Sequence, residues 1–334
     1  MLIALDTNVW LKERLLRSAT GAALLYSLSL VGGRLLLPDT TRREIFAGVK
    51  RDGSGAVSSV ERGLRLIQQL TGARPDIALP TADDFGKHAE TRLDELSDYL
   101  QHVKIRKTHL SKALDRVINH QAPASTSEQY RDCILWECIL EAGMECQFVT
   151  EDGDFLDKKA NGTVLSPELD KEACGRVRVY KSISELLRVI QAQLPHLNDE
   201  EIANAIASAV VPEMETVTAN QEWRVGNRSG SSVELYATER PSATAAVFAL
   251  EFKALDCEDL EGSKIDEGIA RVLGECMLTK TLDVSELVID RIELYSIRGD
   301  RIKGGAVIVR CPAFIIGTPE TPYKVRYPIP RRPA

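Results

Sequence analysis

Short apolar runs alternate with longer helical stretches over the first 194 residues of this 334-residue chain. The runs with the length and composition of buried strands are Leu2–Leu5, Arg34–Leu37, Gln147–Thr150 and Arg176–Tyr180. Strands that are separated by helices pair side by side in parallel, because each helix carries the chain back across the sheet. The sequence therefore predicts an α/β domain with a mainly parallel, doubly wound sheet.

Helical patterns fill the spaces between these strands. Helices are expected up to about Leu30, directly after residue 38, over most of 57–119, over Glu128–Ala142 and over Glu185–Leu194. The second of them is expected to begin with Asp39 or Thr40 as its N-cap, since short polar side chains bond the free N–H groups there. Apolar residues at helical spacing are expected to face the core, namely Leu93, Leu96, Leu100, Leu110, Leu114 and Ile118.

The pattern changes after Pro195. A short helix at Asn198–Val210 is followed by runs typical of strands, at Val233–Ala237, Ala245–Ala254, Val284–Ile297, Ala306–Ile316 and Tyr323–Tyr327, and by one expected helix at about Asp266–Leu278. The predicted organisation is an α/β domain over 1–194 with a helical insert at about 57–120, a helical linker over 195–211, and a β-rich α+β accessory domain over 212–334. The late apolar runs need cover on both faces, so we expect a homo-oligomer or a protein partner at this domain.

Bulk composition limits the class of protein. No apolar run approaches the roughly 18 residues that span a bilayer, and the N-terminus lacks the basic segment of a signal peptide. The seven cysteines form no CxxC motif, and their scatter indicates buried free thiols in a reducing compartment. We therefore expect a cytoplasmic protein without a membrane partner.

The net charge of −7 argues against a nucleic-acid binder, but the charge is unevenly distributed. Residues 101–120 contain five Lys or Arg and a single Asp, and a second basic cluster begins at residue 42. The residues expected to contact a phosphate backbone are Arg42, Arg43, Lys104, Arg106 and Lys107. The alternative, that these are solvated helix faces, stays open at this point.

Acidic residues stand where the alternating pattern places strand ends and helix starts. Asp6 follows the first strand, Asp152 and Asp154 follow a later one, and Glu44 and Asp132 lie in helices. If they converge, mutual repulsion raises their pKa values unless a cation lies between them. Carboxylate ligands suit a hard divalent ion, so Mg²⁺ or Mn²⁺ fits better than Zn²⁺.

Two other readings of these acids are weaker. A calcium loop starting at Asp152 fails, because Leu156 stands at its fifth position and no glycine follows at the sixth. A phosphatase with a nucleophilic Asp6 would need a second aspartate two residues on, where the chain has Asn8.

Four motifs in this order resemble the PIN domain, the fold of many metal-dependent ribonucleases. They are Leu5–Val9, Leu37–Ile45, Arg131–Trp136 and Phe148–Phe155. The long stretch between Glu44 and Asp132 and the C-terminal domain exceed the compact toxin type, which indicates a larger bacterial branch of the family.

The resemblance implies a three-layer α/β/α fold and a set of site residues. It implies catalytic roles for Asp6, Glu44, Asp132 and Asp152, metal ligation by Asp6, Asp132, Asp152 and Asp154, and orientation of Asp6 by Thr7, Asn8 and Thr150. The implied activity is endoribonuclease cleavage that leaves 5′-phosphate and 3′-hydroxyl ends. The implied partner is nucleic acid, with RNA as the favoured substrate. A toxin or phage-defence setting is one expectation. The alternative is a catalytically inactive PIN-like protein that binds nucleic acid or acts as a scaffold.

Overall fold

The computed structural model describes residues 1–125, 129–157, 164–191, 194, 199–218, 223–258, 264–296 and 311–312. The chain divides into two compact units. Within the described residues, the first unit comprises Met1–Leu15 and Leu28–Leu186, and the second comprises Leu16–Ser27 and everything from Leu187 onward. The predicted boundaries at 194 and 212 stay predictions.

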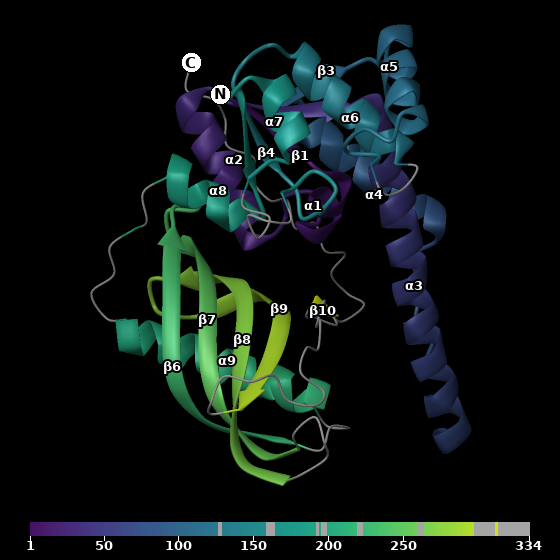
Figure 1. Cartoon of the computed structure of the whole chain (residues 1–334). Helices are drawn as coiled ribbons and strands as arrows, with labels where there is room; N and C mark the ends of the chain where they lie inside the picture. Colours follow the sequence, from purple (N-terminus) through teal and green to yellow (C-terminus); the bar gives the residue numbers. More distant parts are fainter. Residues whose placement is uncertain are drawn as a thin grey trace. The chain divides into compact units, whose positions relative to one another are not determined.

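The first unit is built on a five-stranded sheet with the order β3-β2-β1-β4-β5 (Figure 1). Its strands are β1 (Leu2–Leu5), β2 (Arg34–Pro38), β3 (Leu100–Val103), β4 (Cys146–Val149) and β5 (Val177–Tyr180). Every neighbouring pair is parallel. The carboxyl ends of all five strands therefore lie at one edge of the sheet, and the predicted α/β fold with a parallel sheet is confirmed.

Helices flank this sheet. They are α1 (Thr7–Lys12), α2 (Ala19–Val31), α3 (Asp39–Thr71), α4 (Ala82–Glu95), α5 (Lys107–Ile118), α6 (Tyr130–Glu141), α7 (Pro167–Ala173) and α8 (Ile183–Ile190), with a 3₁₀ turn η1 (Ser97–Tyr99). Trp136 and Ile139 of α6 and Leu169 of α7 pack on Ala4 and Phe148 of the central strands. α7 lies between the strands at Gln147–Thr150 and Arg176–Tyr180, where the sequence pattern predicts no helix.

The single helix predicted up to Leu30 is wrong, because the chain breaks between α1 and α2. Arg14, Leu15 and Leu16 have φ angles of 50°, 57° and 59°, in the left-handed region that leucine rarely adopts. The Leu15 side chain is buried, and the buried Arg92 donates from Nε to the Leu15 carbonyl at 3.0 Å. Tertiary packing thus holds a local conformation that no sequence propensity favours.

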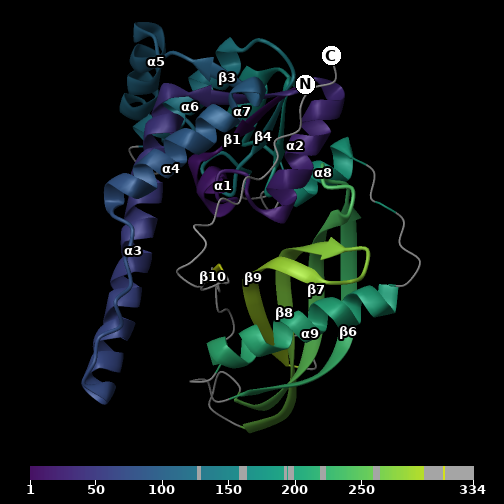
Figure 2. The ribbon, with the colours of Figure 1, turned by 180° about the vertical axis from the view of Figure 1, so that it is seen from behind.

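α3 begins at Asp39 with Pro38 as its N-cap residue, so neither Asp39 nor Thr40 takes the predicted capping role. The helix continues for 33 residues without a break and ends at Gly72, whose φ of 76° suits glycine. Its C-terminal part reaches beyond the other elements of the first unit (Figure 2).

The predicted helical insert at about 57–120 needs two corrections. It contains β3, a four-residue edge strand that pairs with β2 and is too short for its pattern to stand out. Of the predicted core stripes, Leu93, Leu96 and Leu100 are buried, but those on α5 are not. Leu110, Leu114 and Ile118 are 39%, 51% and 64% exposed. Helical spacing identifies a common face, and packing decides whether that face is covered.

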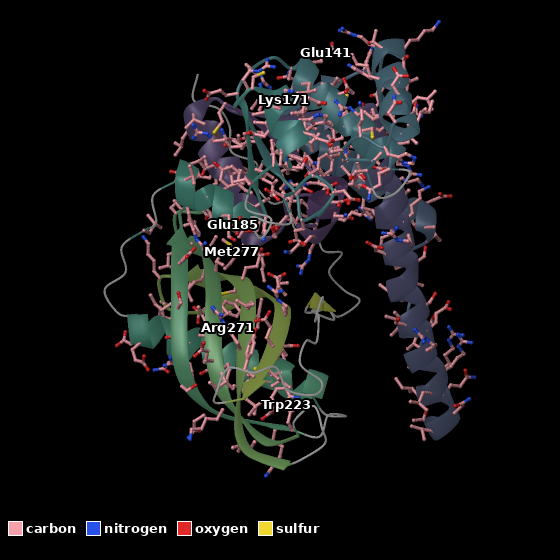
Figure 3. The ribbon with its side chains drawn as sticks, in the orientation of Figure 1. Glu141, Lys171, Glu185, Trp223, Arg271 and Met277 are labelled. Carbon is pink, nitrogen blue, oxygen red and sulfur yellow. The ribbon has the colours of Figure 1, made fainter. Side chains whose placement is uncertain are left out.

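The second unit is an antiparallel sheet with the order β10-β9-β8-β7-β6. Its elements are α9 (Asp199–Thr218), β6 (Arg224–Tyr236), β7 (Ala243–Glu258), β8 (Lys264–Thr279), β9 (Val284–Ser296) and β10 (Cys311–Pro312). Ile206, Val210 and Met214 of α9 share a core with Phe248 of β7 and with Trp223, which precedes β6 (Figure 3). The prediction that 195–211 is a linker is corrected, since α9 contributes to the core of this unit.

The helix predicted at Asp266–Leu278 is wrong, because these residues lie in β8. Alternate residues Ala270, Val272 and Cys276 are fully buried, which is strand periodicity. Pairing with β7 on one side and β9 on the other overrides the helix propensity of the segment. The strands predicted at 306–316 and 323–327 lie outside the described residues, apart from β10. The expected homo-oligomer or protein partner, which depended on those runs, stays a prediction that light scattering can test.

Burial leaves most cysteine thiols inert. It raises the pKa of Cys133 to about 11 and that of Cys138, Cys146 and Cys276 to about 12. These four are free and buried, as predicted, whereas Cys174 is free and exposed. The side chains of Cys257 and Cys311 lie outside the described part of the chain. Among the described residues, no helix combines the length and the apolar content needed to cross a membrane.

Gly274 in β8 allows the close approach of β9. A Cβ atom there would lie 2.2 Å from the Val288 carbonyl oxygen and 2.6 Å from the Phe248 ring. We expect Gly274→Ala to lower the free energy of unfolding of the second unit by about 1–3 kcal/mol or more, because backbone must shift. Gly230→Ala is the matched control, since its Cβ would meet only the flexible Glu251 carboxylate, at 3.0 Å. Equal urea midpoints for the two variants would contradict the prediction.

Candidate active site

Asp6 lies at the carboxyl end of β1 and is the N-cap residue of α1. Its side chain is 4% exposed, and its backbone N–H donates to the Val149 carbonyl at 3.0 Å. Thr150 donates from Oγ1 to Asp6 Oδ2 at 2.9 Å. Since Thr150 directly follows β4, this bond joins the ends of two neighbouring strands.

The turn after β4 places Asp152 beside Asp6. The Asp152 N–H donates to Thr150 Oγ1 at 3.0 Å, so one hydroxyl orients both aspartates. The Asp154 N–H then donates to Asp152 Oδ1 at 2.9 Å. The turn fixes the Asp152 carboxylate from its own backbone, as short acidic side chains often do.

Glu44 of α3 is held by two donors. Thr7 donates from Oγ1 to Glu44 Oε2 at 2.7 Å, and Arg131 donates from Nη1 to Oε1 at 3.0 Å. Both donors neighbour an acid of the site, Asp6 in one case and Asp132 in the other. Glu44 is therefore positioned by the two elements that carry the other acids.

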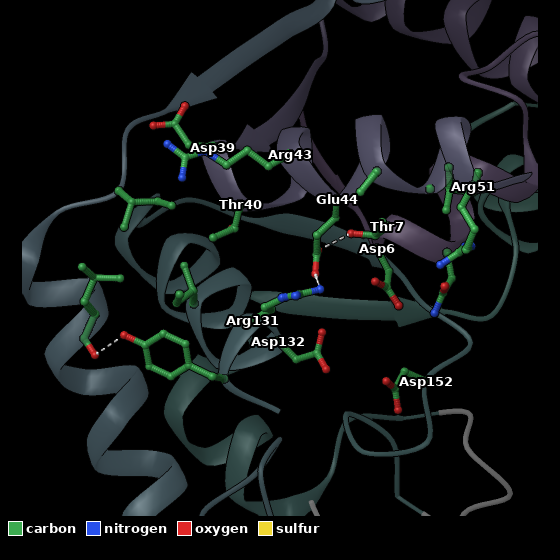
Figure 4. A pocket seen from close by; sticks show the side chains of 18 residues that line it. Asp6, Thr7, Asp39, Thr40, Arg43, Glu44, Arg51, Arg131, Asp132 and Asp152 are labelled. Carbon is green, nitrogen blue, oxygen red and sulfur yellow. Dashed lines mark hydrogen bonds and ion pairs between the residues drawn. The ribbon is translucent and has the colours of Figure 1, made fainter. Parts of the chain in front are cut away.

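One cavity of about 880 Å³ brings these acids together. It is lined by Asp6, Glu44, Asp132 and Asp152, which come from β1, α3, α6 and the turn after β4 (Figure 4). Asp132 lies in the first turn of α6, where the positive end of the helix dipole favours a carboxylate.

Burial and mutual repulsion raise two pKa values in this cavity. The pKa of Asp6 is raised to about 6, chiefly by burial and further by the charges of Asp152 and Glu44, although the Thr150 hydrogen bond opposes the rise. The pKa of Asp132 is raised to about 7 by burial and then by the charge of Asp6 and the other acids. Both carboxylates resist ionisation because they are buried and because other negative charges lie near them.

The carboxylate oxygens of the site suit a hard divalent cation, although they do not form a ready-made ligand cluster. Among the described residues, no group of three or more His, Cys, Asp or Glu side chains is arranged to hold a metal ion directly. Mg²⁺ keeps several waters and needs only one or two protein carboxylates besides substrate phosphates. Oxygen donors and raised carboxyl pKa values agree with that mode of binding.

Residues 3–155 match a family model described as a PIN domain. This part of the chain is a PIN domain. The match includes Asp6, Glu44, Asp132 and Asp152, and it ends just after the turn that carries Asp152 and Asp154. PIN domains are generally nucleases that use divalent metal ions, so the family indicates a hydrolase that binds nucleic acid. A search of curated proteins found no match.

Not every residue predicted for the site lies as expected in this PIN domain. Asp154 lines a separate cavity of about 340 Å³ and accepts a hydrogen bond from Gln129 Nε2. The Thr7 hydroxyl donates to Glu44, and only the Thr7 backbone N–H donates a hydrogen bond to Asp6. Asn8 lines the main cavity, but no hydrogen bond joins it to Asp6 in the described structure.

The predicted phosphate-binding residues divide into two groups. Arg43 lines the cavity, and within the described residues it has no ion pair. Arg42 does not line it; its guanidinium lies 5.4 Å from the centre of the Phe46 ring and 3.9 Å from Glu90.

On and before α5, Lys104 and Lys107 are exposed, whereas Arg106 pairs with Glu141 at 2.5 Å. Arg116 was counted with this basic stretch, but it is buried and bonds Glu137 at 2.7 Å. It is not available to a phosphate.

Arg131 is the most informative residue that sequence reasoning passed over. It stands directly before Asp132 within one of the PIN motifs, but its partner Glu44 is 87 residues away. Gln129 and Tyr130 belong to the same helix start, and Lys12 pairs with Glu151 at 2.6 Å beside the acidic turn. Only the fold brings these partners together, so no sequence signal identifies them beyond their closeness to a motif.

The raised pKa of Asp6 gives a stability prediction for the metal-free protein. Its ordinary value is 3.8 and its folded value about 6, so between these pH values the folded state binds more protons than the unfolded state. The contribution of Asp6 to stability therefore falls as pH rises from about 4 to 6. Asp6→Asn removes the charge and keeps an oxygen for Thr150. We expect it to be more stable than wild type by about 1–3 kcal/mol at pH 8.

The measurement is urea unfolding at several pH values in chelator. The gain from Asp6→Asn should shrink towards zero at pH 4. Asp76→Asn, in an exposed loop, is the matched control and should change nothing. A variant Asp6→Asn less stable than wild type at pH 8 would show that the Asp6 charge stabilises the fold.

Proposed function

We propose that this protein is a metal-dependent endoribonuclease. The observation that carries the proposal is that Asp6, Glu44, Asp132 and Asp152, four carboxylates from separate parts of a PIN domain, line one cavity. Burial and, after it, repulsion between the acids raise the pKa values of Asp6 and Asp132, and a bound cation relieves this electrostatic state. Such a cluster has no structural use that would compensate for its cost.

We assign the ion as Mg²⁺ or Mn²⁺, held by Asp6, Asp132 and Asp152 either directly or through coordinated water, with Asp154 as an outer partner. When bound, the ion lowers the pKa of a coordinated water and neutralises negative charge on the phosphate. Cleavage of the P–O3′ bond by water then gives 5′-phosphate and 3′-hydroxyl ends.

The chain's own residues orient these participants. Thr150 fixes Asp6 and Asp152 relative to each other. Glu44 receives one donor on each oxygen and keeps lone pairs free, which suits it to accept a hydrogen bond from the attacking water. Arg43 has no acidic partner in the described structure and is placed to contact a phosphate at the cavity wall.

The alternative is a PIN-like protein that binds nucleic acid without cutting it. One observation favours it, namely that no three described acidic, imidazole or thiol side chains are arranged to hold an ion directly. The intact set of four acids favours catalysis. The toxin or phage-defence setting stays a prediction.

The nuclease assignment is tested by matched aspartate variants. We expect Asp6→Asn and Asp152→Asn each to lower the rate of cleavage of single-stranded RNA by about 10²-fold or more, because each removes a ligand and its charge. Asp154→Asn should lose less, since its carboxylate lines a different cavity. Cleavage should require added Mg²⁺ or Mn²⁺ and stop in chelator. Full activity of Asp6→Asn in a preparation free of contaminating nuclease would refute the assignment.

A second test concerns the two exposed lysines that flank the start of α5. Lys104 and Lys107 have no ion pair within the described residues, whereas Lys112 is 3.2 Å from Glu137. Replacing both Lys104 and Lys107 by Gln should weaken RNA binding for all sequences. It should also reduce the slope of log K against log salt by about 1.4, at roughly 0.7 for each phosphate contact on a single strand. Lys112→Gln is the control. An unchanged slope in the double variant means that this face is only solvated.

A further inference from the structure

The main cavity has an apolar arm that metal chemistry does not use. Away from the four acids, its wall is formed by Ile105, Leu110, Tyr130 and Ile134. These residues come from the segment before α5, from α5 and from α6, whose packing on each other is fixed by the buried Arg116–Glu137 pair. The arm is therefore a formed surface of the PIN domain.

The Tyr130 ring is held in place in this wall. Its hydroxyl donates to the Leu110 carbonyl at 3.1 Å, so its hydrogen is used on the backbone of the neighbouring helix. What remains for a ligand is the flat ring, beside a Leu110 side chain that is 39% exposed. A planar apolar wall at the mouth of a polar cavity suits a planar partner.

Polar groups border the same arm. Asp39 and Thr40 line the cavity from the first turn of α3, and Arg43 follows one turn later. In Figure 4, Asp39 and Arg43 lie at the end of the view opposite to Asp6 and Asp152. The buried Thr40 hydroxyl has no hydrogen-bond partner in the described structure. A carboxylate, a hydroxyl and a guanidinium group thus line the same cavity as the apolar wall.

We propose that the arm is a base-binding subsite for the nucleotide next to the scissile phosphate. In this proposal, which rests on the proposed function, the base lies against the Tyr130 ring and Arg43 contacts the adjoining phosphate. A base in the arm cannot remain paired or stacked in a duplex, so the strand is single at this position.

Asp39 makes the subsite selective. A carboxylate accepts hydrogen bonds and donates none, so it favours a base that presents an exocyclic amino group, as adenine, cytosine and guanine do. Uracil presents a carbonyl oxygen there and would leave two acceptors facing each other. We therefore expect uracil, the one RNA base without an exocyclic amino group, to be disfavoured at one position of the substrate.

The first experiment measures binding in the full-length Asp152→Asn background. The probe is a labelled ten-nucleotide single-stranded RNA, intact or with one abasic site at each position in turn, measured by fluorescence anisotropy. Tyr130→Ala should weaken binding of the intact RNA about 5- to 100-fold, the range for loss of one stacked base. At one position the abasic site should weaken binding to the parent and have no effect in Tyr130→Ala.

Three variants control the measurement. Tyr130→Phe keeps the ring and should bind like the parent. Leu114→Ala removes an exposed apolar side chain of α5 outside the cavity, and it should also have no effect. Asp39→Asn should bind the intact RNA but lose the preference against uracil at the sensitive position. The proposal is overturned if Tyr130→Ala binds like the parent, or if it weakens intact and abasic RNA equally at every position.

Cleavage assays with wild-type acids separate this proposal from the proposed function. If the wild-type protein cuts RNA with Mg²⁺ or Mn²⁺ and Tyr130→Ala changes neither rate nor cleavage position, the subsite is refuted and the nuclease stands. The opposite result is that the wild-type protein does not cut RNA, while an abasic site at one position weakens binding only when Tyr130 is present. In that case the nuclease is refuted and the subsite stands.

Discussion

The buried Asp6 carboxylate is the constraint on which the arrangement of the site depends. A charged group that is 4% exposed is costly unless hydrogen bonds or a cation compensate for lost water. Thr150 supplies one such bond, and it can do so only because β1 and β4 are neighbours in a parallel sheet. The position of the first aspartate thus depends on the strand order, and the turn that carries Asp152 depends on the same hydroxyl.

Helix packing then determines how much negative charge this sheet edge must hold. α3 brings Glu44 and α6 brings Asp132 to the same cavity, and Arg131 offsets part of that charge by pairing with Glu44. The arginine does not neutralise the site, since burial and then the charges of the other acids still raise the pKa of Asp132 to about 7. With the site empty, such a cluster of acids makes the folded protein less stable than an apolar surface there would. A loss of stability of this kind is expected where a cation and a phosphate bind.

A second buried network gives the cavity its rigid wall. Arg116 bonds Glu137 of α6 and the Ala122 carbonyl at 2.8 Å, and it pairs with Glu172 of α7 at 2.5 Å. Arg116, which lies within the basic stretch 101–120, is thus a structural crosslink between three helices. Buried charges are tolerated only when paired in this way, and removing one partner of such a pair is strongly destabilising.

The sequence by itself determined the fold class of the N-terminal region and its short list of candidate acids. The alternation of strands and helices, with Asp6 and Asp152 directly after two strands, was sufficient, because parallel strands present their carboxyl ends at one edge. The sequence did not reveal β8, where a residue pattern compatible with a helix forms a strand through pairing on both sides. Nor did it reveal the left-handed turn at Leu15, the edge strand β3 or the exposed face of α5. Only the tertiary structure decided that the Thr7 hydroxyl donates to Glu44 and that Asp154 lines another cavity. It also decided that Arg131 bonds Glu44, which is 87 residues away in the sequence. Local patterns fix which residues share a face, whereas contacts between distant elements decide what that face meets.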